Sequence, residues 1–359
     1  MLSNSHIISR GDGLYSLASD SFLNEYYIIS DEGTRRLMAS PEVVGFDSYM
    51  AMVPPTVKAL KVLKEMDSRH LDRAGILTIL RGGLNYPVEE SCHSAGILTP
   101  DISFMSCERI IRNGIITGLD VKYEQVRTEP DCALIIGDII ASGQTLDLCL
   151  RHVIERFRAA GHNIRKIIFF TVGGTKAIGL MENLTADIRS FWPAFEGFQC
   201  VFYEGIFTVY DDKGVTGINT PDIDFGWKGG AISPEFRDFV LRYDYAPALL
   251  EKCIIYDGGA RRYQIDLHAE EVIEYWKDLL SVADRTDFSA FIAEKTGCSG
   301  VSYEEWLEDV HYAHLDEAEN RWLYNQECGF VKSLEGVSLK EIAQQRICEF
   351  TSTLKKYIC

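Results

Sequence analysis

The sequence lacks several features by which common classes of protein are recognised. It has no basic run, and acidic residues outnumber basic ones by 53 to 36, which gives a net charge of −17. A broad electrostatic grip on nucleic acid needs clustered positive charge. We therefore expect no nucleic-acid partner.

The ten cysteines lack the close spacing of a zinc site or a disulfide framework, because they are dispersed and no C-x-x-C pair occurs. This pattern is typical of reduced thiols in a cytoplasm. The N-terminus, MLSNSHIISRGDG, lacks the basic and apolar parts of a secretion signal, and no apolar run approaches the length of a membrane span. We expect a soluble, cytoplasmic protein with no membrane partner.

What the chain does have, between residues 75 and 210, is an alternation of short apolar runs with helical stretches. Residues 145–160 are amphipathic, end before Gly161 and link two of the runs, as a crossover between parallel strands requires. The sequence therefore predicts an α/β fold in which helices flank a parallel sheet. The predicted strands are 75–80, 102–106, 120–126, 133–138, 167–172 and 199–207.

The two ends of the chain have other patterns, which predict three segments. Residues 1–70 form an N-terminal extension with a strand at 26–29 and a helix whose first turn holds Pro54 and Pro55. Residues 71–231 form the α/β domain, and residues 232–359 a mainly helical C-terminal domain. The helices expected in this last segment are 269–283, 302–324 and 338–358, of which two begin with capping boxes, at Ser302 with Glu305 and at Ser338 with Glu341.

The stretch 134-LIIGDIIASGQT-145 is the first candidate for chemistry. A buried strand delivers Asp138 at its end, and a turn of small residues then leads into a helix. Small side chains let backbone N–H groups converge on an anion, and the start of a helix favours negative charge. The alternative is an ordinary strand-to-helix turn with hydroxyl caps. The turn consists of Ala141, Ser142, Gly143, Gln144 and Thr145.

This stretch resembles the signature loop of the type I phosphoribosyltransferases, in which an apolar strand runs into two acidic residues, two apolar residues and a small-residue turn. The resemblance implies that Asp138 holds the ribose hydroxyls of 5-phosphoribosyl 1-diphosphate (PRPP) and that residues 141–145 hold its 5-phosphate. Gly137 occupies the first acidic position. The ribose contact therefore rests on Asp138 alone.

A second stretch, 76-ILTILRGGLNYPVEES-91, ends its strand in Arg81-Gly82-Gly83. Glycines let the backbone approach a phosphate closely, and an arginine can donate to two phosphate oxygens. A bulge with an exposed arginine and an RNA-type box are the alternatives. The stretch looks like the pyrophosphate loop of the uracil phosphoribosyltransferases, and residues 103–126 look like the hairpin that follows it, in which Arg109 matches an arginine used against PRPP.

A third stretch, residues 203–230, resembles the acceptor loop of the uracil phosphoribosyltransferases, although the family's glycine-rich pattern is not preserved. The resemblance implies that a base acceptor is bound by Ile218, Thr220, Asp222 and Asp224, with Asp224 also near a Mg²⁺ ion carried by PRPP. A different base or base-like acceptor stays open. The resemblance covers about residues 71–230.

The expected function is transfer of a phosphoribosyl group from PRPP to a uracil-like base or related nitrogen acceptor, with release of pyrophosphate. Arg81, Arg109 and Asp138 are the predicted catalytic residues, Mg²⁺ is the cofactor, and the resemblance implies a homodimer. Catalysis would come from positioning and charge neutralisation. One alternative is a regulator that binds PRPP or a nucleotide without transferase activity. Another is a scaffold that has lost its ligand.

Overall fold

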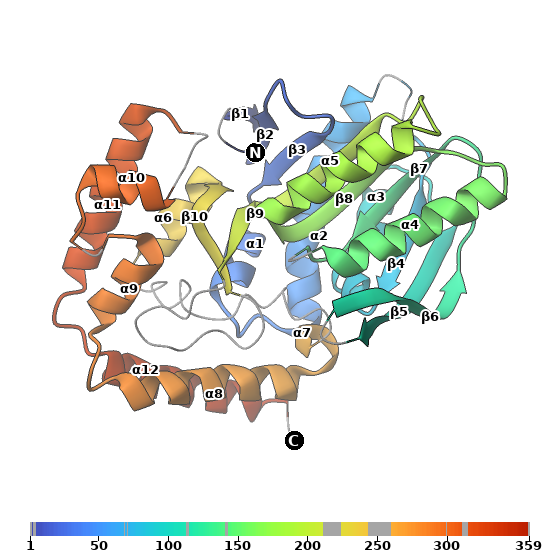
Figure 1. Cartoon of the computed structure of the whole chain (residues 1–359). Helices are drawn as coiled ribbons and strands as arrows, with labels where there is room; N and C mark the ends of the chain where they lie inside the picture. Colours follow the sequence, from blue (N-terminus) through green and yellow to red (C-terminus); the bar gives the residue numbers. More distant parts are fainter. Residues whose placement is uncertain are drawn as a thin grey trace.

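The computed structural model describes residues 2, 5–67, 69, 71–112, 115–140, 143–210, 224–242, 260–298, 300–310 and 315–357. Within them, ten strands form one sheet in the order β1-β2-β3-β9-β8-β7-β4-β5-β6, with β10 paired to β9 (Figure 1). The strands are β1 (His6–Gly11), β2 (Leu14–Ala18), β3 (Glu25–Ile29), β4 (Gly75–Leu80), β5 (Ile102–Arg112), β6 (Ile115–Gln125), β7 (Cys132–Gly137), β8 (Ile164–Gly174), β9 (Gly197–Tyr210) and β10 (Asp224–Ile232).

The centre of the sheet is parallel, as the sequence predicts. Every pairing from β3 through β9, β8, β7 and β4 to β5 is parallel, whereas β1, β2, β6 and β10 pair antiparallel. All eleven residues of β8 are buried, because both faces of the sheet are covered. The mixed α/β class is therefore confirmed.

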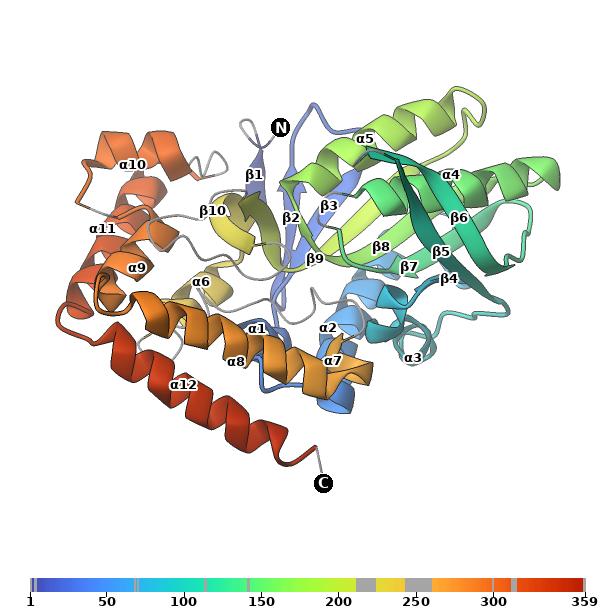
Figure 2. The same ribbon diagram turned by 60° about the horizontal axis from the view of Figure 1, so that its bottom comes forward.

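Helices cover the two faces of this sheet. A first group of helices lies on one face and a second group lies on the other (Figure 2). Alternate residues of a strand serve the two cores, so that Ile135 of β7 faces the first group and Ile136 faces the second. The first group is α1 (Glu32–Ala39), α2 (Gly45–Met66), α3 (Val88–Ser94) and α6 (Pro234–Val240), and the second is α4 (Gln144–Ala159) and α5 (Thr175–Arg189).

Most of the remaining helices build two further cores, one around Trp276, Phe291 and Phe350 and one around Trp306 and Leu323. α8 and α12 run side by side along the molecule, from α9–α11 toward α2 (Figures 1 and 2). The ion pair between Arg346 and Glu42, 3.0 Å long, joins this region to the N-terminal segment. These helices are α7 (Ala260–Tyr263), α8 (Ile265–Val282), α9 (Phe288–Thr296), α10 (Tyr303–Val310), α11 (Glu317–Ser333) and α12 (Leu339–Leu354).

Several predicted helix boundaries are wrong, and α8 begins four residues before the predicted start at 269. α2 begins at Gly45, so Pro54 and Pro55 lie inside it rather than in its first turn. The single helix expected at 302–324 is two helices, because the backbone at Asp316 is extended and its side chain caps α11 through the N–H of Glu319. The predicted division into three segments stays a prediction, and residues 1–70 contribute β1–β3 to the common sheet.

Candidate functional site

Arg81, Gly82 and Gly83 follow β4, and Asp138 follows β7. β4 lies between β7 and β5, so the chain leaves β4 first toward β5 and later returns on its other side. In open parallel sheets, ligands bind outside the carboxyl ends of the strands at such a reversal of strand order. The topology thus brings the first two predicted loops to the same place.

The two loops touch through glycine. A Cβ atom on Gly82 would lie 2.4 Å from Oδ1 of Asp138, and one on Gly83 would lie 3.1 Å from the carbonyl oxygen of Gly137. No larger residue fits at Gly82 unless Asp138 moves. The turn continues as a short 3₁₀ helix, η1 (Gly82–Asn85), after a cis peptide bond between Leu80 and Arg81.

Gly137, the residue before Asp138, is in contact with Tyr86. A Cβ atom there would lie 2.4 Å from Cβ of Tyr86 and 2.9 Å from Cγ2 of Val88. The Tyr86 ring is held in turn, since its hydroxyl accepts a hydrogen bond of 3.2 Å from the N–H of Val172. An acidic side chain at position 137 would therefore need Tyr86 and Val88 to move.

Asp138 is partly buried between these loops. Burial raises the pKa of its carboxyl to about 7, although the backbone N–H of Ile139, which donates to Oδ1 at 2.8 Å, lowers it. The backbone N–H of Asp138 donates to the carbonyl oxygen of Phe170 on β8. The backbone of Asp138 is thus fixed, and the raised pKa brings ionisation of its carboxyl close to neutral pH.

The predicted phosphate turn is described only from Gly143 onward, because Ala141 and Ser142 lie outside the described residues. Gly143 precedes α4 with φ 75°, a left-handed conformation that favours glycine. Gln144 and Thr145 then form the first turn of α4, where backbone N–H groups lack partners within the helix. Such a helix start favours an anion.

Arg109 joins the hairpin to this turn. It lies exposed on β5, and its Nε donates to Oγ1 of Thr145 at 2.5 Å. Just behind this contact, the sulfur atoms of Cys107 on β5 and Cys149 on α4 are 3.0 Å apart. The hairpin and the start of α4 are therefore joined by two contacts, Arg109 with Thr145 and Cys107 with Cys149, and the first of these places a cationic group at the helix start.

Two residues of the C-terminal region reach the turn after β4 and were missed by the sequence analysis. Nη2 of Arg81 donates to Oε1 of Gln264 at 3.3 Å, and Nη1 of Arg262 donates to the carbonyl oxygen of Leu84. These partners are 183 and 178 residues apart in the sequence. No motif or periodicity signals them, because the contacts depend on how the C-terminal region folds back.

Residues 211–223 of the third predicted stretch, which include Ile218, Thr220 and Asp222, lie outside the described residues. Asp224 is the first residue of β10, opposite Tyr210 of β9, and its side chain is not described. No group of three potential metal ligands occurs in the described part of the chain. Acceptor and metal binding by this stretch stay predictions.

Comparisons with known proteins give a partial likeness. No family model and no curated protein matches the chain. A hypoxanthine phosphoribosyltransferase from Staphylococcus aureus is 15% identical with a TM-score of 0.25, over 34% of this chain and 65% of that one. The hypoxanthine phosphoribosyltransferase from Trypanosoma cruzi complexed with IMP is 8% identical with a TM-score of 0.26, over 52% of this chain and 91% of that one.

A hypothetical protein from Neisseria gonorrhoeae with bound ppGpp is 9% identical, with a TM-score of 0.23, over 33% of this chain and 67% of that one. This chain thus spans less than two thirds of the length of the Staphylococcus aureus enzyme. At TM-scores this low, the likeness carries no conclusion about activity, and a shared fold would not by itself imply one.

A buried acid lies elsewhere in the sheet, at Glu204 of β9, whose φ is 63°. Its carboxylate accepts hydrogen bonds from the hydroxyl of Ser30 at 2.6 Å, the N–H of Asp31 at 2.9 Å and the hydroxyls of Thr34 and Ser233. Burial raises its pKa to about 7, although the hydrogen bonds from Ser30, Thr34 and the N–H of Asp31 lower it. The acid joins three segments of the fold, so its role is structural.

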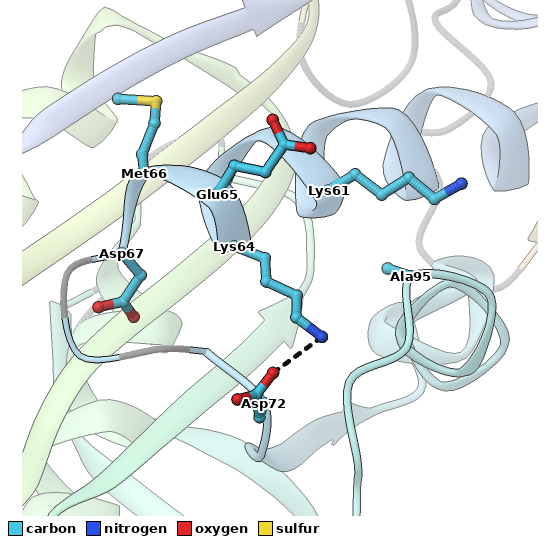
Figure 3. A pocket seen from close by; sticks show the side chains of 7 residues that line it. All are labelled: Lys61, Lys64, Glu65, Met66, Asp67, Asp72 and Ala95. Carbon is cyan, nitrogen blue, oxygen red and sulfur yellow. Dashed lines mark ion pairs between the residues drawn. The ribbon is translucent and has the colours of Figure 1, made fainter.

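A pocket of about 470 Å³ lies at the C-terminal end of α2 (Figure 3). Lys64 in its wall is already paired, with Asp72 at 3.0 Å and the carbonyl oxygen of Gly96 at 2.7 Å. Asp72 precedes β4, whereas Arg81 follows it, so this pocket is at the opposite edge of the sheet from the candidate site.

Among the described residues, no helix combines the length and the apolar character needed to cross a bilayer.

Proposed function

We propose that the chain binds PRPP at the carboxyl ends of β4 and β7 and transfers its phosphoribosyl group to a nitrogen base, with release of pyrophosphate. The observation that carries the proposal is the contact between Gly82 and Asp138, since a side chain on Gly82 would overlap the carboxylate. Two loops that resemble the pyrophosphate and ribose loops of one family thus adjoin each other.

The parts have distinct roles in this proposal. Arg81 and the backbone of Gly82 and Gly83 bind the pyrophosphate, Asp138 accepts hydrogen bonds from the ribose hydroxyls, and the start of α4 binds the 5-phosphate. Arg109 lies beside that start. A chain of net charge −17 repels an anionic substrate at long range, so these local cations and N–H groups are needed to bind it.

The displacement needs no covalent intermediate with the protein. The base attacks C1 of the ribose while pyrophosphate leaves, and the protein contributes alignment and neutralisation of the leaving charge. Mg²⁺, carried by PRPP, supplies further positive charge at the pyrophosphate. By the same resemblance, Asp224 is the carboxylate that would lie near this ion.

A uracil-like acceptor is the finer part of the proposal and rests on the resemblance of residues 203–230. The experiment is to measure PRPP binding with Mg²⁺ by calorimetry and pyrophosphate release with a panel of bases that includes uracil and hypoxanthine. Binding together with release for one base supports a transferase and names its acceptor. A chain that does not bind PRPP would refute the proposal. Light scattering tests the proposed homodimer.

A regulator that binds PRPP or a nucleotide without turnover is the second candidate. It is favoured by the packing of Tyr86 against Gly137, which leaves one acid where the family has two. Binding of PRPP without pyrophosphate release, for every base in the panel, would support the regulator over the transferase.

A further inference from the structure

The C-terminal region reaches the proposed pyrophosphate turn at one place, where α7 ends and α8 begins. α7 packs beside α2 (Figures 1 and 2). From there Arg262 and Gln264 contact the turn after β4, each through a side-chain hydrogen bond. The two contacts are on different parts of the turn, since one is to Leu84 and the other to Arg81.

The Arg262 guanidinium is held on two sides. Nη1 donates to the carbonyl oxygen of Leu84, and the group lies over the Tyr49 ring of α2, 4.3 Å from its centroid. A charged donor makes a stronger hydrogen bond than a neutral one, and an aromatic face fixes the plane of the guanidinium. Leu84 is within η1, whose first residues are the two glycines. Arg262 therefore fixes the conformation of a glycine turn that is otherwise easily deformed.

Gln264 is fixed in a different way. It is the residue before α8, and its carbonyl oxygen accepts a hydrogen bond of 3.0 Å from the N–H of His268. Its side-chain oxygen accepts from one terminal nitrogen of Arg81. A guanidinium has five N–H donors, so this contact orients Arg81 and leaves donors for a phosphate. Without it, an exposed arginine samples many rotamers, and ordering it would weaken ligand binding.

We infer that Arg262 and Gln264 are positioning residues of the pyrophosphate turn, which makes the helical C-terminal region part of the binding site. The inference rests on the proposed function. Arg262 holds the backbone of the turn and Gln264 holds the side chain of Arg81. Within the described part of the predicted 5-phosphate turn, residues 143–145, the hydrogen bond to Thr145 comes from Arg109 and not from Arg262 or Gln264. The inference therefore predicts a selective effect on pyrophosphate.

The test compares two ligands by calorimetry with the full-length chain, magnesium pyrophosphate and ribose 5-phosphate. Arg262→Ala is expected to weaken pyrophosphate binding about tenfold, as for loss of one charge-assisted hydrogen bond, and to leave ribose 5-phosphate binding unchanged. Arg262→Lys, which keeps a cationic donor, is expected to recover part of the affinity. Gln264→Ala, which removes no charge, is expected to weaken pyrophosphate binding about threefold.

Arg321→Ala is the matched control, because Arg321 also lies over an aromatic ring of the C-terminal region, that of Tyr303 at 4.0 Å, but belongs to α11. It should leave both affinities unchanged. Equal pyrophosphate affinities of wild type and both alanine variants would overturn the inference. So would an equal loss for both ligands, which indicates general damage to the fold. If the wild type binds neither ligand, the proposed function fails first and the inference fails with it.

Discussion

Gly137 offers the sharpest test of the packing around the candidate site. In Gly137→Ala, the new methyl carbon would lie 2.4 Å from Cβ of Tyr86, 2.8 Å from its Cγ and 2.9 Å from Cγ2 of Val88. Carbon atoms in good contact are about 3.5–4.0 Å apart, so at least one chain segment must move by about 1 Å. Overpacking of this kind costs about 1–3 kcal/mol of the free energy of unfolding.

Urea denaturation followed by circular dichroism measures this loss. The matched control is Gly329→Ala in α11, where a Cβ atom would meet no atom within 4 Å. Alanine is the better helix former, so the control should be neutral or more stable by about 0.5–1 kcal/mol. In a Tyr86→Gly background, which removes the nearest carbon, Gly137→Ala should cost much less, with a coupling of about 1–3 kcal/mol.

The reasoning is refuted if Gly137→Ala unfolds at the urea concentration of the wild type, or if its cost is the same with and without Tyr86. If the cost is as expected, Gly137→Asp alone cannot restore the acidic pair of the family, because the fold is damaged before the carboxylate can act. The informative variant for activity is then Gly137→Asp combined with Tyr86→Gly.

Three further predictions concern the carboxylates. Gly82→Ala, whose Cβ would lie 2.4 Å from Oδ1 of Asp138, should weaken PRPP binding about 10–100-fold in calorimetry. Gly75→Ala, whose Cβ would have its nearest contact at 3.4 Å, is the control and should leave PRPP binding unchanged. Equal PRPP affinities of Gly82→Ala and the wild type would contradict the proposed site. Because the pKa of Asp138 is raised to about 7, its carboxylate forms as pH rises through that value, so PRPP affinity should rise from pH 6 to pH 8. Asp138→Asn should remove the part of this pH dependence that comes from the carboxylate. An unchanged dependence of affinity on pH would count against a role for the carboxylate. Burial raises the pKa of Asp67, but hydrogen bonds, chiefly from Arg165, lower it to about 2, so the stabilisation by its carboxylate is complete above about pH 4 and is lost as pH falls toward 2. Asp67→Asn should therefore lower the free energy of unfolding by about 3–5 kcal/mol in urea denaturation at pH 7 and by much less at pH 2. A loss that does not depend on pH would disprove the assignment.

The sequence could predict the elements of the candidate site that are local. The strands ending at Leu80 and Gly137 are apolar runs closed by small or charged residues, so their ends and the loops after them are visible in the sequence. The order of strands around β4 then brings Gly82 and Asp138 together, which is what parallel crossovers imply.

Other features depend on contacts that no local pattern encodes. The space at position 137 is limited by Tyr86, which belongs to a different loop. Arg262 and Gln264 precede the first helix predicted in the C-terminal region, and their contacts depend on how that region folds back. The start of α2 was misplaced because two adjacent prolines favour a first turn, whereas here they lie inside a long helix packed on the sheet.

The position of β3 has a consequence for how the chain folds. Glu25 to Ile29 pair in parallel with Gln199 to Tyr203, so a strand near the N-terminus joins the sheet only through a partner made much later. Pairing across such a sequence separation carries a large loop-closure cost and is slow. During synthesis, β3 therefore cannot pair with β9 until residues 197–210 have been made. Arg81 gains Gln264 later still, so the contacts of the candidate site are complete only after residue 264 has been made.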